Sequence, residues 1–167
     1  MTPADVTPSR LRWRAGALAL LIVAVDQLAK LWAVAALEGT AGRTILADVL
    51  RLDLARNSGA AFSFGAGRAT WVFTLLAAAV VLGMIWFFPR LTGVRTRAAA
   101  VLLMGGATGN LIDRLVRSPG AGNGHVVDYI HVRNFPIFNV ADICITVAAA
   151  LFVLASLATG KPAEGQS

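Results

Sequence analysis

Residues 69–88 read ATWVFTLLAAAVVLGMIWFF, an apolar run that contains no charged side chain. A transmembrane helix needs about 20 largely apolar residues, because the hydrocarbon core of a bilayer is about 30 Å thick. The run therefore predicts a membrane-spanning helix, and it decides the fold class of the chain.

The composition of the whole chain agrees with this prediction. The 167 residues are 57% hydrophobic and only 14% charged, whereas a soluble domain carries roughly 25% charged residues. Such figures exclude a soluble globular domain, and they exclude disorder, whose signature is low hydrophobicity. The net charge of +6 would suggest nucleic acid in a soluble protein. Here it indicates loop charges that set membrane orientation, so we expect no nucleic-acid partner.

Three further segments are apolar enough to cross a membrane. We expect a membrane α-helical fold in which residues 1–167 form one integral membrane domain, with disordered tails at about 1–9 and 160–167. The four predicted spans lie at about 15–37, 69–88, 98–115 and 139–158.

The basic residues before the first span resemble the start of a signal peptide, but Asp26 and Lys30 interrupt the pattern before any cleavage site. Four spans place both termini on one side of the membrane. Basic residues crowd against the span ends on that side, which favours cytoplasmic termini. Two long loops, 38–68 and 115–138, then lie on the outer side.

These outer loops carry strand patterns. Leu50, Leu52 and Leu54 alternate with polar residues, and a β-branched run follows at residues 126–132. In the second strand, Asp128 shares its face with apolar neighbours. We therefore predict a small extracytoplasmic β-sheet that lies on the outer membrane surface.

The polar residues inside the spans admit two readings. Asp26 and Lys30 are spaced i,i+4 on one helix face, which favours a structural intramembrane ion pair. Asp113 and Arg114 at the outer end of the third span fit either a functional site or an interfacial anchor.

Asp128 and Asp142 form the more informative pair. Two carboxylates that meet in a low-dielectric site cannot both ionise, so one keeps its proton while the other stays anionic. That division supplies a general acid and a general base, as in aspartic proteases. His125 and His131 lack metal-ligand spacing, and the single Cys144 cannot form a cluster, so we expect no metal and no cofactor.

Five blocks of the sequence, spread over about 70% of the chain, resemble the lipoprotein signal peptidase (signal peptidase II) family. Each block alone is weak, but their joint order is highly specific. The blocks are Asp26-Gln-Leu-Ala-Lys30, Asn57-Ser-Gly-Ala-Ala-Phe-Ser63, Gly105-Gly-Ala-Thr-Gly-Asn-Leu-Ile-Asp-Arg114, Val126-Val-Asp-Tyr-Ile130 and Phe138-Asn-Val-Ala-Asp142.

The resemblance implies a bacterial inner-membrane aspartic endopeptidase with its active site at the outer leaflet. Such an enzyme removes the signal peptide of a diacylglyceryl-modified prolipoprotein just before the lipidated cysteine. The implied catalytic residues are Asp128 and Asp142. The implied partners are that substrate and membrane lipids, and a monomer suffices. The other implied motif residues, beside Asp26 and Lys30, are Asn57, Gly109, Asn110, Asp113, Arg114, Asn139 and Ala141.

Two alternatives remain at this point. Intramembrane acids such as Asp26 also mark ion pathways, which would fit a small proton-coupled transporter, although a carrier gathers its polar groups near the bilayer midplane. A four-span assembly factor is the other, but it needs no carboxylate on an apolar strand face.

The chain departs from the family in one respect. The glycine-rich stretch 118–124 is longer than the family usually has.

Overall fold

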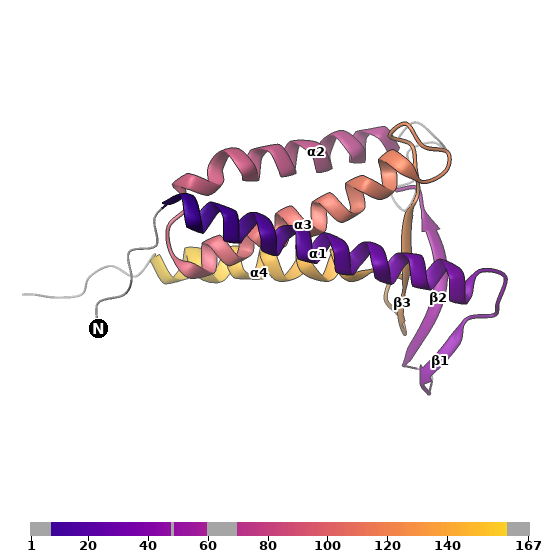
Figure 1. The fold of residues 1–167 in the computed structure, drawn as a ribbon. Helices are drawn as coiled ribbons and strands as arrows, with labels where there is room; N and C mark the ends of the chain where they lie inside the picture. The colour runs from indigo at the N-terminus through magenta and orange to yellow at the C-terminus, as the bar shows by residue number, and fades with distance from the viewer. Residues whose placement is uncertain (1–7, 48, 60–69, 160–167) are drawn as a thin grey trace, which may run out of the picture.

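A computed structural model describes residues 8–47, 49–59 and 70–159 of the chain. Figure 1 shows long helices lying side by side, with a small sheet across one end of the bundle. The helices are α1 (Pro8–Leu37), α2 (Thr70–Phe87), α3 (Val94–Val116) and α4 (Val140–Thr159). All four are long and apolar enough to cross a membrane, so the predicted helical membrane fold is confirmed.

The predicted spans differ from the helices mainly at their starts. Helix α1 begins at Pro8, so the predicted disordered tail was wrong at residues 8 and 9; the rest of both tails lies outside the described residues. Arginine is a good helix former, which lets α1 extend back through the basic segment. Helix α3 begins at Val94, because Gly93 ends the preceding turn with a φ of 77°.

Helix α3 is the centre of the bundle and contacts α1, α2 and α4. Its glycines permit this close approach. A Cβ atom on Gly105 would lie 2.7 Å from the Ile22 side chain, and one on Gly106 would lie 2.6 Å from the Ala141 carbonyl oxygen. Small residues let membrane helices pack backbone to backbone. Along α1, α2 and α4, large apolar side chains remain exposed, as expected of surfaces that face lipid.

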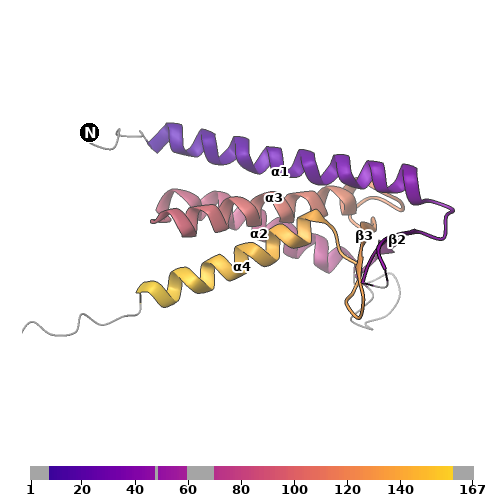
Figure 2. The same cartoon turned by 90° about the horizontal axis from the view of Figure 1, so that it is seen from below.

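The sheet has three antiparallel strands in the order β1 (Arg43–Leu46), β2 (Leu50–Asn57) and β3 (Val126–Val132). Both predicted strands are confirmed. Strand β1 was not predicted, since it is a four-residue exposed edge strand without apolar alternation. In both views the sheet lies at the end of the bundle that holds the C-terminus of α1 (Figures 1 and 2).

Two features fix the sheet to the helices. Ala33 and Leu37 of α1 pack against Val127 and Tyr129 of β3 in one buried apolar cluster. The β2–β3 register also shifts between Leu52 and Ala55, which leaves two β2 residues opposite one β3 residue. Such a bulge bends the strand and redirects neighbouring side chains. This bulge lies directly beside Asp128, the partner of Ala55.

Candidate active site

Asp128 lies in the middle of β3, and its side chain is almost fully buried. The Nδ2 of Asn139 donates to its Oδ1 at 2.6 Å, and the Nδ2 of Asn57 donates to its Oδ2 at 3.0 Å. The sequence predicted only that Asp128 shares a strand face with apolar residues, and the structure buries its side chain. The strand, however, is covered on both faces at this point, since Val127 and Tyr129 are buried as well.

Asp142 lies in the first turn of α4. The helix opens with a reciprocal cap. The Oδ1 of Asn139 accepts from the backbone N–H of Asp142 at 3.0 Å, and the Oδ2 of Asp142 accepts from the backbone N–H of Asn139 at 3.2 Å. Asn110 of α3 donates its Nδ2 to the Oδ1 of Asp142 at 2.8 Å.

Two asparagines thus join the two carboxylates. The side chain of Asn139 contacts Asp128 directly and also caps the helix turn that carries Asp142. The Oδ1 of Asn110 accepts from the Nδ2 of Asn139 at 3.3 Å. Asp128 on a strand and Asp142 on a helix are therefore held by one hydrogen-bonded unit. Spacing alone left open whether the two carboxylates come together, and these hydrogen bonds place both in one network.

The surroundings of Asp128 favour its protonated form. Burial, together with the negative charge of Asp142, raises the pKa of Asp128 to about 6. The amide donors Asn57 and Asn139 oppose this rise, because hydrogen bonds to a carboxylate stabilise its charged form. Asp142 instead lies at a helix N-terminus, where the helix dipole favours negative charge.

Beneath this pair, buried ion pairs link α1 to α3. Lys30 lies 2.9 Å from Asp26 and 2.9 Å from Asp113, and all three side chains are fully buried. Arg117 adds a further ion pair to Asp113 at 2.7 Å. The predicted Asp26–Lys30 pair is present. The alternative of Asp113 as an interfacial anchor is wrong, because its carboxylate is enclosed and holds Lys30.

Lys30 connects these charges to the carboxylate pair above them. Its Nζ donates to the Oδ1 of Asn110 at 2.9 Å, the same oxygen that accepts from Asn139. Asn110 therefore bonds to Lys30 through its oxygen and to Asp142 through its nitrogen, so the position of Asp142 depends on that of Lys30. An ordered charge network under the site is a means of fixing the geometry of its side chains.

Two members of this network were missed from the sequence. The Nε2 of Gln27 donates to Asp26, to the carbonyl oxygen of Gly109 and to Asp113 at 3.0–3.2 Å. Its polar side chain within an apolar span was the available signal. Arg117 was the other, and its i,i+4 spacing from Asp113 could have indicated the ion pair.

Only small residues fit at positions 109 and 141, because helices α1, α3 and α4 converge there. A Cβ atom on Gly109 would lie 2.4 Å from the Oδ2 of Asp26. The backbone N–H of Ala141 donates to the Oδ1 of Asp26 at 3.0 Å. Asp26 thereby ties the start of α4 to α1.

Arg114 brings a positive charge to the same end of α3. Its Nη1 donates to the backbone carbonyl of Asn110 at 3.1 Å, and its buried Nε has no partner among the described residues. Its guanidinium interacts electrostatically with Asp142, Asp113 and Asp128. The structure thus brings together every predicted site residue, with the 57–63 block described only as far as Gly59.

The glycine-rich stretch 118–124 packs onto the bundle. The Thr74 hydroxyl of α2 donates to the carbonyl oxygen of Gly122 at 2.6 Å, and the N–H of Gly124 donates to that of Arg114 at 2.9 Å. These residues are thus held against α2 and α3, directly before the strand that carries Asp128.

Four apolar helices with a buried carboxylate pair at the sheet end define a membrane enzyme fold, and comparisons agree. The chain superposes on a solved bacterial membrane enzyme structure with a TM-score of 0.77 and 27% sequence identity, covering 92% of this chain and 94% of that one. The profile of the signal peptidase (SPase) II family matches residues 18–158. The chain belongs to the signal peptidase II family.

Individual relatives support the assignment. The chain is 41% identical to the lipoprotein signal peptidase of Mycobacterium avium over 93% of this chain and 84% of that protein. It is 40% identical to the lipoprotein signal peptidase of Mycobacterium tuberculosis (strain H37Rv) over 92% of this chain and 75% of that protein. With its four spanning helices, it is a multi-pass bacterial membrane protein.

Proposed function

We propose that this protein is an aspartic endopeptidase that removes the signal peptide from diacylglyceryl-modified prolipoproteins, cleaving before the lipidated cysteine. Family membership supports the substrate class. The observation that carries the catalytic assignment is the link between Asp128 and Asp142 through Asn139. Neither the family match nor the structural likeness supports the transporter alternative.

In this proposal the two aspartates divide the proton chemistry. Asp142, at the N-terminus of α4, is the anion that takes a proton from water. Asp128, whose pKa is raised to about 6, donates its proton to the oxygen of the scissile carbonyl. The hydroxide bonds to the carbonyl carbon, which gives a neutral tetrahedral intermediate.

The intermediate then collapses with the protons returned. Asp142 gives its newly acquired proton to the nitrogen of the leaving amine, and the carbon–nitrogen bond breaks. Asp128 takes the proton back from the hydroxyl group as the new carboxyl group forms. Both aspartates end in their starting states, so no covalent enzyme intermediate and no cofactor are needed.

The remaining site residues act through the pair. Asn110 and Asn139 orient the carboxylates, and Asn57 stabilises the charged form of Asp128 by donating a hydrogen bond to it. Arg114 has one buried donor, its Nε, without a partner among the described residues, and its positive charge beside the carboxylates suits the substrate backbone. Lys30 and the acids around it hold this end of the bundle together.

The location of the site suits a lipidated substrate. The carboxylates lie where α3, α4 and the sheet meet, at one end of the apolar bundle. A signal helix lying beside the bundle, with acyl chains in the same leaflet, would present its scissile bond at that depth. We propose that the sheet end faces outward and both termini face the cytoplasm, because arginines crowd the opposite helix ends.

The test uses two precursor peptides of the same sequence, one carrying the diacylglyceryl cysteine and one carrying unmodified cysteine. The purified protein in detergent should cleave the lipidated peptide before the cysteine. It should cleave the unmodified peptide at least about 100-fold more slowly, because binding energy from the lipid helps to position the scissile bond. Equal cleavage of both peptides would contradict the proposed substrate class, whereas cleavage of neither would contradict the peptidase function.

A further inference from the structure

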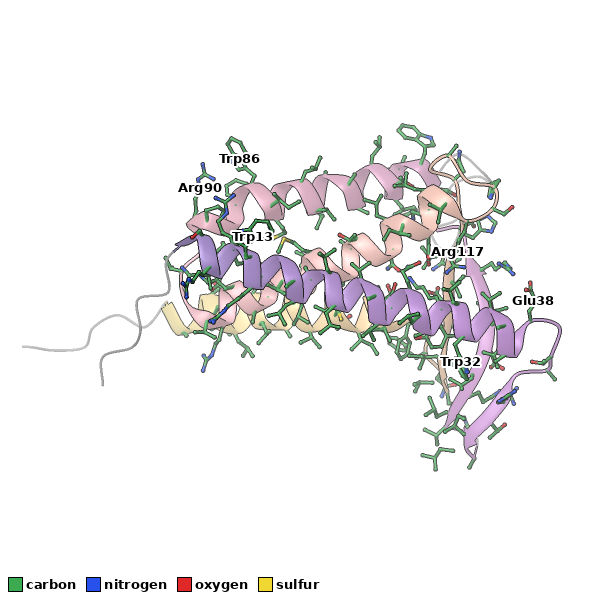
Figure 3. The ribbon with its side chains drawn as sticks, viewed as in Figure 1. Trp13, Trp32, Glu38, Trp86, Arg90 and Arg117 are labelled. Carbon is green, nitrogen blue, oxygen red and sulfur yellow. The ribbon has the colours of Figure 1, made fainter. Side chains whose placement is uncertain are left out.

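The end of the bundle opposite the sheet carries a concentration of arginines without acidic neighbours. Described residues 8–25, 86–105 and 148–159 contain no Asp or Glu. Figure 3 shows Trp13, Trp86 and Arg90 at this end, away from Glu38 and Arg117 at the sheet end. Tryptophan and arginine at a helix-bundle end mark a membrane–water interface. The arginines here are Arg10, Arg12, Arg14, Arg90, Arg95 and Arg97.

Two of these arginines line a groove between α1 and the start of α3. The groove has a volume of about 560 Å³ and is otherwise apolar. Its floor includes Ala15, Phe88 and Val101, which belong to one buried apolar cluster. Arg14 and Arg97 are its charged lining residues.

The charged residues of the groove lie toward one of its ends, and the rest of its length is apolar. The groove runs along α1 from Leu11 to Ile22, which is about 16 Å at 1.5 Å per residue. One leaflet of the hydrocarbon core is about 15 Å thick. The charged end therefore lies at the interface while the apolar part extends over most of one leaflet.

These dimensions and charges fit one class of ligand. A phospholipid has an anionic phosphate at its head and an acyl chain that enters the hydrocarbon. Basic pockets between membrane helices recognise anionic lipid headgroups. Arg97 is fixed toward this region, because its Nε donates to the backbone carbonyl of Leu91 at 3.0 Å and leaves its other guanidinium nitrogens for a second partner.

We propose that this groove is a binding site for an anionic phospholipid. Its acyl chain lies along α1 and α3, and its headgroup is held by Arg14 and Arg97. The site is separate from the carboxylate pair, which lies at the opposite end of the bundle, so it stands independently of the proposed function.

The experiment measures lipid binding by native mass spectrometry of the full chain in detergent. The probes are phosphatidylglycerol and phosphatidylcholine with identical acyl chains. Phosphatidylglycerol should bind at least tenfold more tightly. The R14Q/R97Q variant should lose about 30-fold in affinity for phosphatidylglycerol, since each arginine near an anionic headgroup contributes about fivefold.

The matched control is R10Q/R95Q, which removes the same charge from the same end outside the groove. It should change the affinity by no more than about twofold. R14Q alone preserves the Arg97–Leu91 bond and should lose about fivefold, so a folding defect of the double variant leaves the test intact. A98W fills the groove without changing charge and should abolish tight binding.

Three results would overturn the proposal. The first is equal loss in R14Q/R97Q and R10Q/R95Q, which would assign the effect to overall surface charge. The second is phosphatidylcholine binding as tight as that of phosphatidylglycerol, or undiminished binding in A98W. The third is a two-chain complex that forms in place of lipid binding and is lost in A98W, which would make the groove a self-association surface.

Discussion

The side-chain nitrogen of Asn139 lies 2.6 Å from the Oδ1 of Asp128, which joins the start of α4 to the centre of β3. The oxygen of the same amide caps the turn that carries Asp142. One side chain therefore sets the position of both carboxylates. Its two roles can be separated, because capping needs an acceptor and the contact with Asp128 needs a donor.

Asn139→Ser should uncouple these roles. Serine is also a good N-cap, so the thermal unfolding temperature should stay near that of the parent. The serine hydroxyl ends one bond short of the amide nitrogen that donates to Asp128, so this contact is lost and kcat should fall roughly 100-fold, the typical effect of a misplaced catalytic group. Asn139→Ala should lose about 1 kcal/mol of stability in addition. A parental kcat in Asn139→Ser would show that Asn139 serves only as a cap.

Asn57→Ala should shift the pH dependence of cleavage. A raised carboxyl pKa means that the proton on Asp128 is lost as pH rises through about 6, so kcat/KM should fall along an alkaline limb there. The limb belongs to the coupled pair. Removing the Asn57 donor disfavours the charged form, which should move the limb upward by roughly half a unit.

Ser58→Ala is the control for this shift, because the carbonyl oxygen of Ser58, not its side chain, is the acceptor for Thr70. It should leave the limb in place. A shift of the limb to lower pH in Asn57→Ala would contradict the role assigned to Asn57.

Gly109→Ala should destabilise the protein. The added methyl group would lie 2.4 Å from the Oδ2 of Asp26, and overpacking of this kind costs about 1–3 kcal/mol. Gly83→Ala in α2 is the matched change, since a Cβ atom there meets nothing within 4 Å. It should be neutral or up to about 1 kcal/mol stabilising. Thermal unfolding in detergent compares the two, and equal values would refute the packing argument.

Lys30→Met should be more damaging than loss of a surface ion pair. It leaves Asp26 and Asp113 buried without their shared cation, which costs about 3–5 kcal/mol. Arg56→Met breaks the exposed Arg56–Glu38 pair and should cost less than about 1 kcal/mol. Adding Asp113→Asn to Lys30→Met should recover part of the loss. The absence of any recovery would show that lost packing, not unpaired charge, dominates.

The helices and two strands followed from the sequence, because apolar length and alternation are local signals. The buried state of Asp113 did not follow, because its neighbour Arg114 made an interfacial anchor equally reasonable. Asp113 can be buried because Lys30 of α1 forms an ion pair with it across the contact between α1 and α3. The sequence showed no sign of β1, whose pairing with β2 depends on the neighbouring strand and not on its own residues.

The candidate site was predictable to a different extent. Resemblance to a family selected Asp128 and Asp142, and spacing alone left their meeting open. The bridge through Asn139 and Asn110 depends on how β3, α3 and α4 converge. Gln27 was passed over because a single amide within a span carries no spacing pattern. Its three acceptors come from α1 and α3 together.

The most direct test of the central claim is cleavage of the lipidated precursor peptide by Asp128→Asn and by Asp142→Asn. Asparagine keeps the size of each side chain, so both variants should insert and unfold like the parent. Each should lose cleavage by at least about 10⁴-fold, because neither remaining aspartate can serve as both acid and base. Cleavage at a rate near that of the parent in either variant would contradict the assignment of these two aspartates as the catalytic pair.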